Sequence, residues 1–211
     1  MKTEDFIRAL AADNTRPIVP IGRVLLIALA IGALLSASLL LLTLHPRPDL
    51  EAALYTPAFV FKLIVALSLA AAASARLSEA ARPLSRFRWR YALVLPPALL
   101  AGGIITELSI MPAQTWLPRL VGHNALHCLM LIPLLSLAPT SCLLIALRRG
   151  APMRPGFAGA MAGLVSGGVG AVLYALTCPD DSPLFIAAWY SIAVMVVTAI
   201  SGYIGSRALR W

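Results

Sequence analysis

The sequence predicts an all-α membrane protein with six transmembrane helices, arranged as three hairpins with both termini in the cytoplasm. Of its 211 residues, 60% are hydrophobic and only 12% are charged, whereas a soluble domain carries about 25% charged residues. The hydrophobic residues fall into six runs, each close to the roughly 20 residues that a helix needs to cross a bilayer. The basic residues concentrate on one side of these runs, and this asymmetry orients the helices.

The six runs set the domain boundaries. Residues 1–23 form a polar N-terminal segment, residues 24–206 form the transmembrane domain, and residues 207–211 form a short tail. The predicted spans are 24–44, 57–75, 91–111, 124–147, 156–177 and 184–206. The first span is too long for the core of a signal peptide, so we expect it to be retained.

The N-terminal segment predicts a short helix. It has a hydroxyl cap, an acidic first turn and apolar residues at one-turn spacing, which are Thr3, Glu4, Asp5, Phe6, Ile7 and Leu10. A helix of about three turns is marginally stable alone in water.

Proline pairs mark two of the spans. Pro96 and Pro97 are expected to kink the third span, and Pro133 and Pro139 to bend the fourth.

Small residues mark two other spans. The fifth carries Gly159, Gly163 and Gly167 at four-residue spacing, and the first carries a weaker pair, Gly32 and Ser36. Small residues on one helix face let two backbones approach closely in lipid. We expect the glycines to pack within the chain in preference to forming a dimer.

The basic residues orient the bundle. Those outside the spans all lie on the side of the N-terminus except Arg47 and Arg119. Positively charged loops stay in the cytoplasm, so both termini are predicted to be cytoplasmic. This topology accounts for the net charge of +8 without nucleic acid. The short polar turn from Cys178 to Pro183 then faces the other compartment, the periplasm of a Gram-negative cell.

Two cysteines are predicted to lie at similar depth near that face. Cys128 is near the outer end of the fourth span and Cys178 ends the fifth, so the thiols could meet if these helices are neighbours. Cys142 is about 20 Å further along the fourth span, too far to join them.

Metal-ligating residue types surround these thiols. His123 and His127 are four residues apart and would share a helix face. Together with Asp180, Asp181 and the cysteines, they offer ligands for a metal ion. The pattern fits a redox or metal sensor and, about equally well, a buried cysteine beside aspartates that cap a turn, because no CxxC or HExxH spacing is present.

Two charged residues lie inside the spans. Lys62 and Glu107 are each a short distance from the outer boundary, so they are expected to form an intramembrane ion pair, or Lys62 extends outward to the interface. The sequence contains no nucleotide-binding loop, nucleophile elbow or catalytically spaced carboxylates, so an enzyme is not predicted.

Taken together, these features resemble the negative regulator of sigma F (NrsF) family of bacterial inner-membrane anti-sigma factors. The resemblance covers essentially the whole chain. It rests on the six spans, the N-terminal M-K-T-E-D-F-I-R-A-L-A-A-D segment, Cys128, the glycine-rich fifth span and the string C-P-D-D-S-P-L-F-I-A-A-W-Y.

The resemblance implies a protein that sequesters an extracytoplasmic-function sigma factor at the inner membrane and releases it on a periplasmic redox or metal stress signal. Cys128 and Cys178 would be the sensing pair, whereas Cys142 does not match the family pattern. The sigma factor would be bound by the N-terminal segment through Glu4, Asp5, Phe6, Ile7 and Leu10.

The expected partners are this sigma factor and the lipid bilayer, with no direct contact to nucleic acid, and the oligomeric state stays open. No cofactor is expected, apart from a metal ion bound transiently at the periplasmic cysteines. Two alternatives stay open from the sequence: a small transporter or channel, and a membrane scaffold whose cysteines are inert.

Overall fold

The computed structural model describes residues 20–81, 91–150 and 152–210. Within them the chain forms six helical spans that are long and apolar enough to cross a membrane. They are α2 (Ile21–Thr43), α4 (Pro57–Ala80), η1 with α5 (Ala92–Val94 and Leu95–Ile110), α7 (Ala125–Leu147), α8 (Pro155–Ala175), and the continuous run of α9, η3 and α10 (Pro183–Phe185, Ile186–Tyr190 and Ser191–Ala208).

The six predicted spans are present as helices, and their bounds lie within a few residues of those expected from the sequence. The largest difference is in the second, where α4 continues to Ala80. Three short helices lie between spans: α3 (Leu50–Ala53), η2 (Ala113–Thr115) and α6 (Trp116–Val121). The predicted N-terminal helix lies outside the described residues, as does the arginine-rich segment 82–90.

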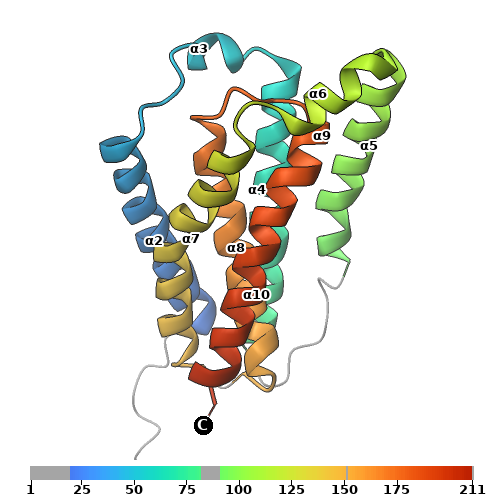
Figure 1. Cartoon of the computed structure of the whole chain (residues 1–211). Coiled ribbons are helices and arrows are strands. Elements are labelled where there is room, and N and C mark those ends of the chain that lie inside the picture. The colour runs from blue at the N-terminus through green and yellow to red at the C-terminus, as the bar shows by residue number, and fades with distance from the viewer. Residues whose placement is uncertain (1–19, 82–90, 151, 211) are drawn as a thin grey trace, which may run out of the picture.

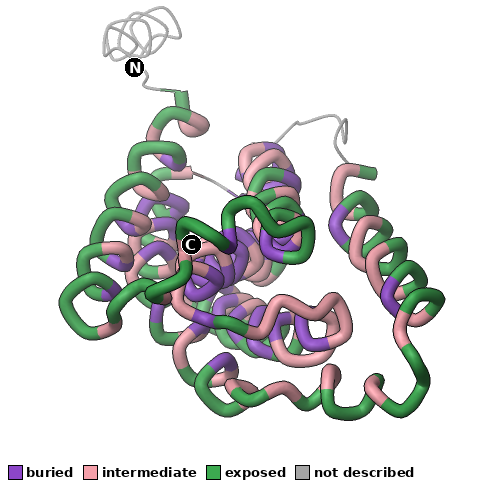
Figure 2. The backbone as a smooth tube through the Cα atoms, turned by 90° about the horizontal axis from the view of Figure 1, so that it is seen from above, coloured by how far each residue is buried: buried purple, intermediate pink, exposed green. Residues whose placement is uncertain are grey.

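α8 occupies the middle of the bundle and is the most buried of the spans (Figure 1). It packs against α4, α7 and α10. Seen from above, buried residues gather in the middle of the bundle and exposed residues surround them (Figure 2).

The glycines of α8 make this central position feasible. A Cβ atom added to Gly159 would lie 2.6 Å from the carbonyl oxygen of Ser201 on α10, and one added to Gly163 would lie 2.6 Å from the Cβ of the same serine. The Ser201 hydroxyl also donates a hydrogen bond to the carbonyl of Gly159, at 2.7 Å. The glycines therefore pack within the chain, as expected, and fix α10 against α8.

The small residues of α2 pack against a proline of α7. Pro139 lies inside α7 and has no N–H, so the carbonyl of Leu135 loses its intrahelical donor. The hydroxyl of Ser36 donates to that carbonyl instead, at 2.6 Å. Gly32, one turn earlier on α2, leaves room for the ring of Pro139. The contact satisfies a backbone group that lipid could not satisfy.

α5 stands at the edge of the bundle and is the least buried span (Figure 1). Pro96 and Pro97, which the sequence predicts to kink this span, fall in the first turn of α5, directly after the 3₁₀ turn η1, and proline is common in the first turn of a helix.

The two described ends of the chain lie at the same end of the bundle, because Leu209 belongs to the same buried cluster as Leu25. The short helices α3, α6 and α9 gather at the opposite end (Figure 1). This second end carries the segment between α8 and α9, residues 176–182, which we call the 176–182 turn.

Candidate functional site

The 176–182 turn is bonded to every other connection described at its end of the bundle. Three of its polar residues, Asp180, Asp181 and Ser182, each bond to a different part of the structure. The turn also carries Cys178, which is 1% exposed. We therefore take this turn and the residues around it as the candidate site.

Asp180 caps the start of α7. Its carboxylate accepts hydrogen bonds from the backbone N–H of His123 at 3.1 Å, the backbone N–H of Asn124 at 2.9 Å, and the side-chain amide of Asn124 at 3.0 Å. The first N–H groups of a helix have no intrahelical acceptor and favour a negative charge. Asp180 thus supplies, from the α8–α9 connection, the cap that α7 lacks locally.

Asp181 binds two cations from the first half of the chain. One carboxylate oxygen accepts a hydrogen bond from Arg47 at 2.9 Å, and the other forms an ion pair with Lys62. Arg47 is itself held by Asp49 at 2.6 Å. This pairing raises the pKa of Arg47 above its ordinary value, mainly through the hydrogen bond to Asp49. Arg47 therefore stays charged next to Asp181.

Lys62 on α4 also holds the backbone of the turn. Its side chain is fully buried, and its Nζ donates to the carbonyl of Cys178 at 2.9 Å and to that of Asp180 at 3.3 Å. The ring of Phe59 lies beside both cations, 5.4 Å from Lys62 and 5.6 Å from Arg47. A buried ammonium requires such a full set of partners.

Glu107 on α5 binds the end of the turn. It accepts hydrogen bonds from the hydroxyl of Ser182 at 2.7 Å and from the backbone N–H of Leu184 at 3.0 Å. Its side chain also forms an ion pair with Arg119 on α6. Glu107 therefore joins α5 and α6 to the first turn of α9.

The sequence-based pairing of Lys62 with Glu107 is corrected by these contacts. Lys62 pairs with Asp181 and Glu107 pairs with Arg119, because the 176–182 turn lies between the two spans and supplies partners to each. Arg47 and Arg119 were not singled out as site residues. One signal in the sequence points to them: they are the two basic residues outside the spans that lie on the side away from the N-terminus.

Both candidate sensing thiols are buried at this end of the bundle, Cys178 within the turn and Cys128 on α7. Cys128 on α7 and Cys178 belong to one cluster with Tyr174, Phe185 and Tyr190, and neither thiol is in a disulfide. The Tyr190 ring lies 5.8 Å from Tyr174 and 6.2 Å from Phe185, centroid to centroid. The expectation that the two cysteines lie at similar depth is thus consistent with their shared cluster.

Burial raises the pKa of the Cys178 thiol, and the nearby charge of Lys62 opposes that rise. A thiolate is the reactive form of cysteine, so this thiol reacts slowly while it is buried. Cys142 is half-buried and lies outside this cluster.

Tyr190 and Trp189 lie on η3, a single turn of π-helix before α10. The indole N–H of Trp189 donates a hydrogen bond to the carbonyl of Leu120 at 2.9 Å. This bond connects α6 to η3. π-turns inside α-helices occur frequently at functional sites.

The proposed metal ligands do not converge. Among the residues that the structure describes, no three histidine, cysteine, aspartate or glutamate side chains are placed to hold a metal ion. His123 lies before α7, next to Gly122 with its positive φ of 59°, so it does not share a helix face with His127. The imidazole of His123 is 97% exposed and 3.7 Å from Asp180, while both aspartates are engaged with protein donors.

The chain matches one family of known proteins over nearly its whole length. Residues 10–211 match the family described as "Negative regulator of sigma F". The "Anti-sigma-F factor NrsF" of Caulobacter vibrioides is 37% identical over 216 residues, and the "Probable anti-sigma-F factor NrsF" of Azospira oryzae is 32% identical over 216 residues, with all of each chain covered in both cases. No solved structure matches the chain significantly. The chain therefore belongs to the negative regulator of sigma F family, NrsF.

Proposed function

We propose that this protein is a membrane-bound anti-sigma factor that releases its sigma factor when a periplasmic signal reacts with Cys128 and Cys178. The names of its two full-length relatives support the anti-sigma role. The observation that carries the sensing half is that Cys128 shares one buried cluster with Cys178, which lies in the turn that bonds to the other connections at that end.

The partner in this proposal is an extracytoplasmic-function sigma factor held at the inner membrane. The cytoplasmic N-terminal segment makes the contact, with Phe6, Ile7 and Leu10 in a groove of the partner and Glu4 and Asp5 against its basic residues. A segment of this length folds on contact, as amphipathic helices in grooves do. These residues lie outside the part of the chain that the structure describes.

The signal acts on the thiols by a change in their chemistry. Modification of Cys178 adds atoms or removes a proton in a site where the thiol is 1% exposed, so the turn must move to accommodate it. Movement of the turn loosens the cap on α7, the ion pair to α4 and the hydrogen bond to Glu107 on α5, because all three depend on the same seven-residue segment.

α8 conveys that change to the other side of the membrane. It ends at Ala175, next to the turn, and packs closely against α4, α7 and α10 along its length. Closely packed helices shift as rigid elements and do not deform continuously. A displacement of α8 at the thiol end therefore also moves the opposite end of the bundle, from which the sigma-binding segment extends.

A pull-down from detergent-solubilised membranes tests the partner and its contact. Full-length protein is compared with a variant that lacks residues 1–13, and co-purified sigma factor is quantified. Recovery by the full-length protein alone is the expected result. Recovery by both proteins would move the contact away from the N-terminal segment, and recovery by neither, with both proteins intact and the sigma factor expressed, would contradict the anti-sigma role.

A further inference from the structure

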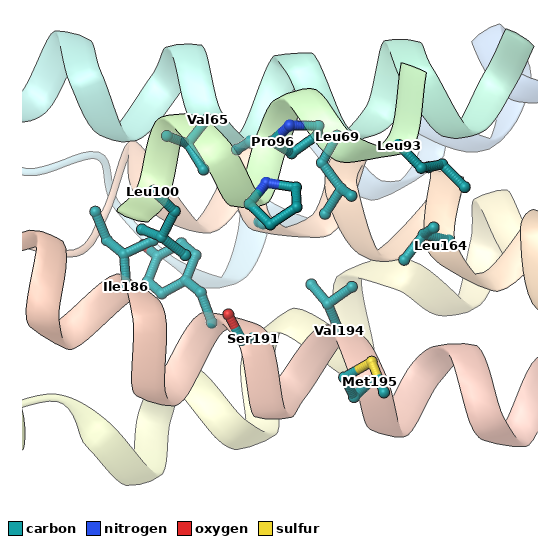
Figure 3. A pocket seen from close by; sticks show the side chains of 14 residues that line it. Val65, Leu69, Leu93, Pro96, Leu100, Leu164, Ile186, Ser191, Val194 and Met195 are labelled. Atoms are coloured by element: carbon teal, nitrogen blue, oxygen red, sulfur yellow. The ribbon is translucent and has the colours of Figure 1, made fainter. Parts of the chain in front are cut away.

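A cavity of about 310 Å³ lies between α5 and the body of the bundle. Figure 3 shows its walls: Pro96 and Leu100 of α5 face Ile186, Ser191 and Val194 of the α9–α10 run across it. α4 and α8 contribute further apolar side chains. Its size falls within the range of small-molecule sites, about 300–1,000 Å³.

The cavity opens sideways from the bundle. α5 packs against α4 and the short α9, whereas α10 packs against α7 and α8, so α5 and α10 diverge below α9. Two of the residues that line it, Met195 and Pro97, are exposed, Met195 to 64%. These residues lie on the outer surface of a helical span, which in a membrane faces lipid.

The cavity lies at mid-depth. Val65 is about 12 Å along α4 from its start, and Leu164 is about 16 Å along α8 from its end. A bilayer has a hydrocarbon core of about 30 Å. The opening therefore faces acyl chains and lies away from the headgroups and water.

The chemistry of the walls fits a hydrocarbon and little else. The described residues around it are aliphatic or proline, apart from Tyr190, Ser191 and Met195, and none of these described residues is charged. A free fatty acid would bring a carboxylate that no described lining residue could pair with, whereas the chain of a phospholipid enters while its headgroup stays at the interface. Unfilled apolar walls lose dispersion contacts on one side.

We propose that this cavity is a lateral binding site for one acyl chain of a membrane phospholipid. The chain supplies α5, the least buried span, with packing along the face that it turns toward α10. It also contacts Tyr190, whose ring packs in the cluster of Cys178. The bound lipid thus lies against the wall of the thiol site.

Photo-crosslinking tests the site directly. The full-length protein is reconstituted in nanodiscs that contain a phospholipid with a diazirine in the middle of one acyl chain, irradiated and mapped by peptide mass spectrometry. We expect labelling of Leu100 and Val194 to exceed, severalfold, that of Leu34 and Leu42, which are exposed on α2. Equal labelling of the two regions would indicate ordinary surrounding lipid and overturn the proposal.

A blocking variant provides the second measurement. Ser191→Trp fills the cavity. It is expected to abolish the excess label at Leu100 and to leave the label at Leu34 unchanged. Ser191→Ala is the matched control, which is expected to keep the excess label at Leu100. If Ser191→Trp does not give a monodisperse protein, Leu100→Trp blocks the opposite wall, and the label is read at Val194. Labelling that persists in a folded blocking variant would overturn the proposal.

Discussion

The Nζ of Lys62 lies 2.9 Å from the carbonyl oxygen of Cys178, so a fully buried cation on α4 holds the residue that carries a candidate sensing thiol. The same ammonium pairs with Asp181 three residues later. One side chain on the second span thereby fixes both the thiol and the carboxylate of the 176–182 turn. The stability of this turn should depend on Lys62 more than on any exposed charge near it.

Lys62→Met is expected to destabilise the protein by about 3 kcal/mol, because removal of one member of a buried ion pair leaves its partners desolvated. The measurement is thermal unfolding in detergent, and the matched control is Asp49→Asn, which removes an exposed carboxylate from the same group of charges. The control should change the unfolding temperature little. If Lys62→Met unfolds at the same temperature as the wild type, the ion pair between Lys62 and Asp181 adds no stability.

Gly159→Ala should destabilise the bundle by about 1–3 kcal/mol, as overpacking of a closely packed interior does. The new Cβ would lie 2.6 Å from the backbone oxygen of Ser201, so α8 and α10 must move apart. Gly102→Ala on α5 is the control, since a Cβ there meets nothing within 4 Å. Equal unfolding temperatures for the two variants would refute close packing of α8 on α10.

Ser36→Ala should cost about 1 kcal/mol, because the carbonyl of Leu135 that Pro139 leaves free would have no donor. Ser38→Ala is the control on the same helix, where the hydroxyl bonds to its own helix at an exposed position. The measurement compares the thermal unfolding curves of the two variants under the same conditions. An effect of Ser38→Ala as large as that of Ser36→Ala would mean that the contact with α7 is not the cause.

The pH midpoint for alkylation of Cys178 should be higher in the folded protein than in the denatured protein. Burial raises the pKa of this thiol, so the folded state keeps the proton over a range in which the unfolded state has lost it. The buried, protonated thiol therefore stabilises the folded state fully at pH values below the pKa of the thiol in the unfolded state. This stabilisation is lost as the pH rises through the pKa of the thiol in the folded state. With Cys128 and Cys142 replaced by serine, the iodoacetamide rate is measured against pH for folded and denatured protein. A folded midpoint at or below the denatured one would contradict a buried, protonated thiol.

The sequence predicted the spans because lipid requires long apolar runs, and those are visible one segment at a time. It did not predict which helices are neighbours. In a bilayer the lipid-facing and buried sides of a helix are both apolar, so no hydrophobic face points to the partner. The pairing of Lys62 with Asp181 joins positions far apart in the chain and could not be read from local spacing.

Parts of the candidate site were predictable and others were not. Cys128 and Cys178 were identified from their depth, and the structure places them in one buried cluster. The histidine pair was misjudged because Gly122 ends α6 in a backbone conformation with positive φ, so α7 starts only at Ala125. Arg47 and Arg119 were recognisable as exceptions to the charge asymmetry, but their partners depended on the tertiary structure.

Retention of the sigma factor after thiol oxidation tests the central claim most directly. Membranes carrying the wild type, Cys178→Ser, Cys128→Ser or Cys142→Ser are treated with a thiol oxidant, and the bound sigma factor is quantified after purification. Cys142 is the matched control because it lies on the same helix as Cys128 but outside the thiol cluster. The account predicts release from the wild type and from Cys142→Ser, and retention by the other two variants. Release from Cys178→Ser and Cys128→Ser at the wild-type level would contradict it.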